Sequence, residues 1–408
     1  MSSSAGDVHA DKSAFPAPPA VTGTGALTSG FDKLGVVMAL IAAAALALPF
    51  ANFRPSRIGQ AQGIGFIQAL PAGLAWFGLA LLVLGLIALL RRADPRLRLV
   101  VAAGALLILA VLIGLVPGVL IPPGNIRPRV GPAAGFWLLA FSFAILLTDA
   151  LVKLSLRPAQ RVLALVLTLA VFLAFLFSGH WNGLSIMREY ATNGSGFAAN
   201  AAVHVTLALA SLFGALVVGL PLGIVCQRHR GLRGVVLPAL NMIQTIPSLA
   251  LFGLMIAPLT YLAKTYPLIE AIGVHGTGSS PALIALFLYA LLPVVSNTAI
   301  GLDSVSPNVV DAARGMGMTQ WQRLFQVELP LAFPVILTGV RIVLVQNIGL
   351  ATIAAWIGGG GFGVYVQNGM GATAIDLVLL GAIPTIALAF SAAIILDALV
   401  DILKGRHA

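Results

Sequence analysis

Residues 304–330 read SVSPNVVDAARGMGMTQWQRLFQVELP, a polar stretch that lies between two long apolar runs. Ser306 is a favourable N-cap and Pro307 suits the first helical position, so we expect a short helix to begin there. Gly315 and Gly317 are expected to end this helix, because glycine is a poor helix former.

A second short helix is predicted directly after these glycines. Thr319 and Gln322 have the spacing of a capping box, in which each side chain bonds to the backbone N–H of the other residue. Leu329-Pro330 is expected to end this helix before the next apolar run, since proline has no N–H to donate. The stretch therefore predicts a compact pair of short helices that joins two longer ones.

The apolar runs along the chain have lengths suited to crossing a membrane. A helix rises about 1.5 Å per residue and the hydrocarbon layer is about 30 Å thick, so a span needs roughly 20 apolar residues. The runs are continuously apolar rather than alternating, which favours helices over strands. We predict an all-α membrane protein of about ten transmembrane helices, at residues 34–52, 67–90, 99–121, 135–154, 162–179, 201–226, 235–258, 281–302, 333–357 and 376–402.

Composition supports a membrane protein and excludes several other classes. The 408 residues are 59% hydrophobic and only 9% charged, whereas about a quarter of the residues of a soluble domain are charged. The net charge of +10 comes from short basic groups between the apolar runs, so a nucleic-acid partner is not expected. Cys226 is the single cysteine, and the histidines are scattered, so no metal site, cofactor or internal disulfide is expected.

The distribution of lysine and arginine predicts the orientation. With the N-terminus inside, most basic residues fall in inner connections, which is the rule for cytoplasmic loops. Residues 1–33 are rich in Ser, Ala, Pro and Gly and are predicted to be a disordered cytoplasmic tail. Both termini are therefore expected in the cytoplasm.

The two halves of the chain carry different residues into the membrane. The first five runs are almost purely aliphatic, whereas the last five contain amides and prolines, and polar side chains in a membrane usually face a bundle interior or an aqueous cavity. They fit either a translocation path at a broken helix or hydrogen bonding between helices, and the residues alone leave both open. The candidates for the path are Asn241, Gln244, Ser248, Asn297, Gln346 and Asn347.

The stretch quoted first resembles the "EAA" loop of ABC-importer permeases. That motif has an acid, two alanines, a glycine four residues later, and an aliphatic-x-Leu-Pro ending, with Asp here in place of Glu. The resemblance implies that this loop is the coupling helix that docks onto an ATPase subunit. The matching positions that would couple to the ATPase are Asp311, Ala312, Ala313, Gly317, Leu329 and Pro330, together with Val327.

Flanking segments resemble the glycine betaine/carnitine/choline (osmoprotectant) branch of these permeases, from about residue 200 to 402. They include Gly219-Leu-Pro-Leu-Gly223, Asn241-Met-Ile-Gln-Thr-Ile-Pro-Ser248, Leu292-Pro-Val-Val-Ser-Asn297 and Ala355-Trp-Ile-Gly-Gly-Gly-Gly-Phe-Gly363. The resemblance implies a type I (MetI-like) permease core that moves a small osmoprotectant such as glycine betaine across a bacterial inner membrane. It also implies three partners: an ATP-binding cassette subunit, a periplasmic solute-binding protein and a second, identical or different permease subunit.

The expected organisation has four parts. After the tail come a five-helix membrane region at 34–180, a polar periplasmic connection at 181–200, and a permease core at 201–403 with its coupling loop at 303–330. Neither the residues nor the resemblance gives the five N-terminal helices a function.

Enzymatic activity is not expected, and no catalytic residue is predicted. The chain has no G-x-x-x-x-G-K-[ST] phosphate loop, so ATP hydrolysis is assigned to a separate subunit. Gly358–Gly363 fits G-x-G-x-x-G but follows an apolar run rather than a strand, so a dinucleotide site is excluded. Two alternatives stay open: an ion-coupled secondary transporter, and a membrane assembly protein without transport of its own.

Overall fold

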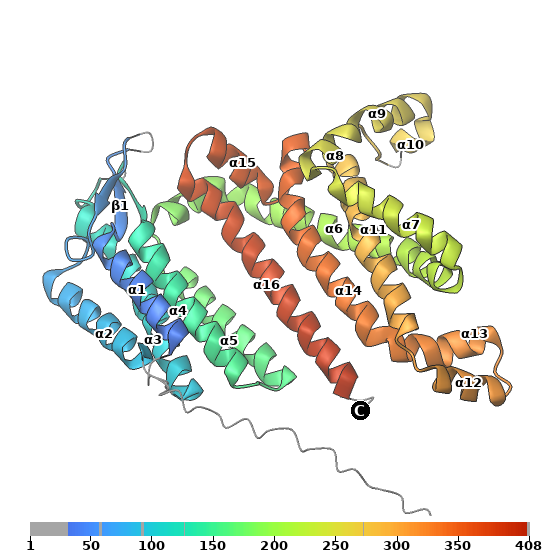
Figure 1. Cartoon of the computed structure of the whole chain (residues 1–408). Coiled ribbons are helices and arrows are strands. Elements are labelled where there is room, and N and C mark those ends of the chain that lie inside the picture. Colours follow the sequence, from blue (N-terminus) through green and yellow to red (C-terminus); the bar gives the residue numbers. More distant parts are fainter. Residues whose placement is uncertain (1–31, 57–58, 91–93, 126, 272, 406–408) are drawn as a thin grey trace, which may run out of the picture.

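The computed structural model describes residues 32–56, 59–90, 94–125, 127–271 and 273–405. The chain is overwhelmingly helical, which confirms the all-α membrane class (Figure 1). Within these ranges, nine helical stretches are long and apolar enough to cross a membrane. Most of the predicted tail, residues 1–31, lies outside the described residues.

The N-terminal region has five helices, and the first four share an apolar core. Figure 1 shows the region beside the rest of the chain; the core residues come from these four helices, their connections and Leu184, whereas the fifth helix contributes none and packs on the C-terminal helix. Arg98, on α3, pairs with Asp32 at 2.6 Å and with Asp149 on α4, which ties the ends of three helices together. The helices are α1 (Lys33–Ala47), α2 (Ala72–Leu90), α3 (Pro95–Leu120), α4 (Ala134–Lys153) and α5 (Pro158–Phe177).

The first predicted span, 34–52, was too long. Helix α1 ends at Ala47, and its 15 residues cover only about 23 Å at 1.5 Å per residue, less than the hydrocarbon thickness. The next residues form β1 (Ala51–Arg54), the central strand of a small antiparallel sheet with β2 (Gln62–Ile64) and β3 (Arg129–Pro132). Phe50 beside β1 is buried and packs edge-on against Phe66 and Phe136, so the sheet closes one end of the bundle.

The second part of the chain begins with a helix of unexpected length. Helix α6 (Ser185–Arg228) has 44 residues, about 66 Å, and includes most of the segment predicted as a polar connection at 181–200. That segment is therefore mainly helical, and only the short turn at residues 178–184 separates α5 from α6. It is followed by α7 (Arg230–Thr245), α8 (Ser248–Leu254), α9 (Ile256–Thr265), α10 (Pro267–Ala271) and α11 (Ser279–Asp303).

The predicted span at 235–258 is broken. Helix α7 ends at Thr245, Ile246 is extended and Pro247 starts a new helix, as expected of a proline that cannot continue the backbone ladder. The last elements are α12 (Pro307–Gly315), α13 (Gln320–Arg323), a π-helical stretch η1 (Leu324–Glu328), α14 (Leu329–Leu350), a 3₁₀ stretch η2 (Ala351–Ile357), α15 (Gly363–Gly371) and α16 (Ile375–Gly405).

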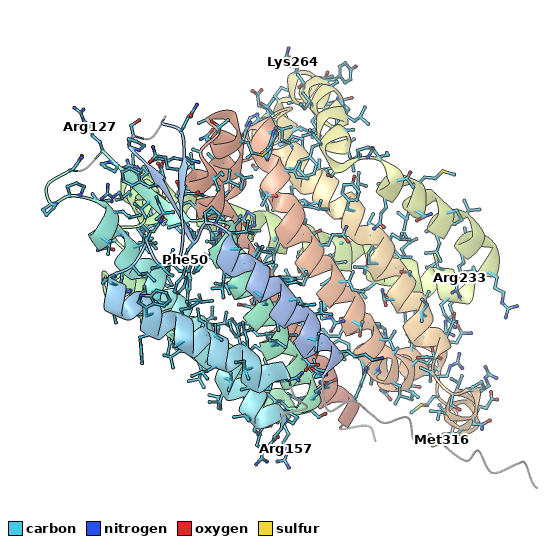
Figure 2. All side chains as sticks on the ribbon, turned by 60° about the vertical axis from the view of Figure 1, so that its left-hand side comes forward. Phe50, Arg127, Arg157, Arg233, Lys264 and Met316 are labelled. Atoms are coloured by element: carbon cyan, nitrogen blue, oxygen red, sulfur yellow. The ribbon has the colours of Figure 1, made fainter. Side chains whose placement is uncertain are left out.

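The bundle has two distinct ends. Helices α12 and α13 project at the lower end in Figure 1, near the C-terminus, and we call this the α12 end. The sheet, α9 and α10 lie at the opposite end, which we call the α9 end. Figure 2 shows Met316 and Arg157 at the α12 end and Arg127 and Lys264 at the α9 end, with the apolar helices between them.

Candidate coupling segment and polar path

The two short helices at residues 307–323 are confirmed. Helix α12 begins at Pro307 with Ser306 as its N-cap residue and ends at Gly315, although the Ser306 side chain makes no capping hydrogen bond. Gly317 follows with φ +78°, a conformation that glycine adopts without strain. Thr319 starts α13 with the predicted capping box: its amide donates to Gln322 Oε1 at 2.9 Å, and its hydroxyl accepts from the Gln322 amide at 3.3 Å.

The break expected at Leu329-Pro330 was wrong. The chain continues without interruption from α13 through η1 into α14. The missing N–H of Pro330 is tolerated because it falls in the first turn of α14, where amides need no helical partner. The preceding turn widens to a π-helix, in which the Leu329 amide donates to the carbonyl of Leu324. Helix α13, η1 and the long α14 therefore form one continuous helical segment.

The motif residues of α12 divide between an outer and an inner face. Asp311 is exposed and pairs with Arg314 at 3.0 Å, and Ala312 is also exposed. Ala313 is 2% exposed and packs against its own chain, so only Ala312 offers a small side chain to a partner. Leu329 packs into an apolar cluster with Leu302, Val305, Leu324, Ala332 and Ile336, whereas Pro330 is exposed.

A buried ion cluster holds this segment to α6, and the sequence analysis did not single it out. Glu328, 3% exposed, accepts from Arg228 Nη2 at 2.5 Å and from Arg323 Nε at 2.8 Å. Arg228 ends α6 and Arg323 ends α13, so one carboxylate joins three elements. The sequence does contain a hint, because Glu328 is a lone acid at the entry to an apolar run, but nothing in the sequence names its partners.

A pocket of about 330 Å³ lies beside this cluster. Its walls come from α6, α11, α12 and η1, and both charge signs are present. Next to the segment, Trp321 and Phe325 are 71% and 60% exposed, and their rings stack with centroids 5.9 Å apart. A soluble surface rarely exposes stacked aromatic rings without a use, and such residues are typical of interfaces.

The predicted path residues are not gathered into one site. Asn347 is fully buried and donates to Ser211 Oγ on α6 at 2.7 Å, and Asn297 donates to the carbonyl of Pro293 on its own helix at 2.8 Å. Gln244 donates to the carbonyl of Tyr289 on α11 at 2.8 Å. Asn347 and Gln244 thus join neighbouring helices, whereas the bond of Asn297 stays within α11.

The remaining candidates face outward or lie half-buried. Asn241 is exposed on α7, whereas Ser248 and Gln346 are half-buried. Asn241 lies about 16 Å along the helix from Arg230, and an exposed amide is costly wherever it faces lipid. This face of α7 is therefore suited to water or to another protein rather than to lipid.

Two family models match most of the chain. Residues 32–187 match the N-terminal domain of the ABC transporter permease YehY, and residues 219–406 match the inner membrane component of binding-protein-dependent transport systems. Fold and segment thus define a multi-pass permease of the ATP-binding-cassette importers. The chain belongs to the family of binding-protein-dependent transport system inner membrane components.

Curated relatives match about half of the chain. The osmoprotectant import permease protein OsmW of Salmonella typhimurium is 46% identical over 44% of this chain and 79% of its own length. The carnitine transport permease protein OpuCB of Listeria monocytogenes is 36% identical over 50% of this chain and 87% of its own length. The choline transport system permease protein OpuBB of Bacillus subtilis is 36% identical over the same shares, 50% and 87%.

Among solved structures, the methionine ABC transporter MetNI in an inward-facing conformation matches with a TM-score of 0.44 and 20% identity, over 51% of this chain and 95% of that chain. The family assignment confirms the importer-permease prediction. It also sets aside the two alternatives, an ion-coupled secondary transporter and an assembly protein without transport.

Proposed function

We propose that this chain carries a small osmoprotectant, such as glycine betaine or a related quaternary ammonium compound, into a bacterial cytoplasm. The observation that carries this proposal is the likeness to permeases named for osmoprotectants, carnitine and choline, which covers 44–50% of the chain. A periplasmic solute-binding protein would deliver the compound at the α9 end. Both termini and the α12 end would then lie in the cytoplasm.

We further propose that Asp311–Pro330 is the contact with the ATP-binding subunit, which would supply all ATP hydrolysis. Three features support this role: an exposed motif helix, exposed aromatic rings at Trp321 and Phe325, and a continuous helical connection into α14. Glu328 would transmit the movement of this segment to α6 through its ion pair with Arg228. The division into an N-terminal region at 34–180 and a core at 201–403 remains part of this proposal.

A second permease subunit would pack against the α7 face, with the translocation path between the two copies. The exposed Asn241 supports this placement, since its amide needs water or a polar partner within the membrane. Gln346 and Ser248, half-buried, would line the path with it. Gln244 and Asn347 would instead hold neighbouring helices together through the bonds given above, and Asn297 would bond within α11.

The test is uptake of labelled glycine betaine by proteoliposomes that hold the full chain, the ATP-binding subunit and the solute-binding protein. Uptake that needs ATP and all three proteins supports the proposal. Carnitine and choline as competitors, with methionine as an unrelated solute, define the substrate class. ATP-driven uptake of methionine but not of betaines would overturn the substrate assignment while leaving the importer class intact.

A further inference from the structure

The N-terminal region meets the permease core at the α12 end through one ion-pair network. Arg161, in the first turn of α5, places Nη1 2.9 Å from Asp397 Oδ2 and 2.9 Å from Asp401 Oδ2, both on α16. The second carboxylate oxygen of Asp397 accepts from Arg341 on α14. Asp397 is therefore shared between the N-terminal region and the helix that continues the coupling segment.

Helix α5 packs along α16, but little of it is buried. Leu165 is the one buried residue of this helix, and the other side chains are exposed or half-buried. Between transmembrane helices, packing and polar contacts take the place of a hydrophobic driving force, because lipid is as apolar as the side chains. The charged network at the first turn of α5 therefore adds a specific polar contact to its packing on α16.

The opposite end of the N-terminal region is also fixed to the core. Helix α6 crosses from one region to the other without a break, and Arg188 near its start donates to the carbonyl of Pro128 at 2.9 Å. Just before α6, Trp181 donates to the carbonyl of Ala110 on α3 at 2.9 Å. The region is held at both ends, as Figure 1 shows for α5, α6 and α16.

These contacts form a continuous mechanical connection. From Arg341, α14 runs back about 20 Å to Glu328, which is clamped to α6. We propose that the N-terminal region braces the permease core through α5, and that Arg161 is the positioning residue through which α5 holds α14 and α16 while α12 and α13 respond to the ATP-binding subunit. This inference rests on the proposed coupling role of Asp311–Pro330.

The experiment uses the full chain with its ATP-binding subunit and solute-binding protein in proteoliposomes. The readout is the ratio of ATPase rates with and without loaded binding protein, which reports coupling rather than the amount of folded protein. Arg161→Gln should lower this ratio about three- to tenfold, in line with the loss of two partly exposed ion pairs. Arg157→Gln, at the exposed N-cap position four residues before Arg161, should leave it unchanged.

Charge exchange separates a positioning role from a general loss of stability. Arg161→Glu should lower the ratio further, because it sets three acids together, and adding Asp401→Arg should restore at least half of the original ratio. A normal ratio in both Arg161 variants, with the wild type active, would overturn the brace. A wild type that shows no stimulation at all would instead contradict the proposed function, so the two failures are distinguishable.

Discussion

Gln244 and Tyr289 connect the end of α7 to α11 through two hydrogen bonds. The Gln244 side-chain amide donates to the backbone carbonyl of Tyr289 at 2.8 Å, and the Tyr289 hydroxyl donates to the carbonyl of Ile246 at 2.5 Å. Pro293, four residues after Tyr289, lacks the N–H that this carbonyl would otherwise bind. Ile246 lies at the break between α7 and α8. The two hydrogen bonds thus hold the break between α7 and α8 against the part of α11 that precedes Pro293.

Replacing Gln244 should cost more stability than replacing the hydroxyl of Tyr289. Gln244→Leu leaves a buried carbonyl without its donor, at about 1–3 kcal/mol, whereas Tyr289→Phe removes one hydrogen bond worth about 1 kcal/mol. Thermal unfolding in detergent measures both losses, with Thr245→Val as an exposed neighbour for control. Equal losses of stability for Gln244→Leu and Thr245→Val would contradict a stabilising role of the Gln244–Tyr289 hydrogen bond.

Glu328→Gln keeps the shape of the side chain and removes its charge. Arg323, itself 7% exposed, would then lose the charged partner that compensates its burial, so we expect a loss of about 3 kcal/mol or more. ATPase stimulation by the loaded binding protein should fall with it. The exposed neighbour variant Gln326→Ala should change neither quantity. Wild-type stimulation in Glu328→Gln would remove this carboxylate from the coupling route.

Gly317→Val should weaken association with the ATP-binding subunit. A β-branched residue at φ +78° costs about 1–3 kcal/mol, which would unfold the turn between α12 and α13. Gly315→Ala is the matched control, because Gly315 has no positive φ and its added Cβ would meet no atom within 4 Å. Co-purification on a tagged ATP-binding subunit is the measurement, and equal recovery of both variants would contradict the role of this turn.

Trp321→Ala combined with Phe325→Ala should reduce affinity for the ATP-binding subunit at least tenfold without lowering the unfolding temperature. Both rings are exposed, so their removal leaves no cavity within the chain, while large aromatic anchors dominate many interfaces. Titration of the purified chain with labelled ATP-binding subunit measures the affinity. Unchanged affinity would place the rings against something other than this partner.

Asp32 predicts a pH dependence of stability. Burial raises the pKa of its carboxyl, but bonds from Arg98 and from the Gly35 amide, with the nearby positive charges, outweigh burial and hold the pKa below its ordinary value of 3.8. Its contribution is therefore present above pH 3.8 and is lost as the pH falls through the lower folded value. As the pH is lowered from 6 to 3, the unfolding temperature should fall more steeply for the wild type than for Asp32→Asn.

Much of the coupling segment was predictable because it depends on local chemistry. Pro307, Gly317 and the Thr319–Gln322 capping box act within one helical turn, and each appears where the sequence indicates. The helix break predicted at Pro330 was wrong for a physical reason. A proline breaks the interior of a helix but not its first turn, and the sequence does not show the π-helical widening that precedes Pro330.

Long-range features were beyond local patterns. The predicted first span runs on to residue 52, yet residues 51–54 form a strand that pairs with β2 and with β3, and β3 lies about 80 residues further along the chain. The partners of Glu328, Asn347 and Arg161 also come from distant helices. Their residue types indicated polar roles, but only the fold identifies what each one binds.

The most direct test of the account compares the chain alone with the chain and its ATP-binding subunit in liposomes containing nucleotide. The account predicts no ATP hydrolysis and no uphill uptake by the chain alone, both activities with the subunit and solute-binding protein present, and neither after deletion of residues 311–317. Sustained ATP-driven uptake by the chain alone, or normal uptake by the deletion variant, would contradict it.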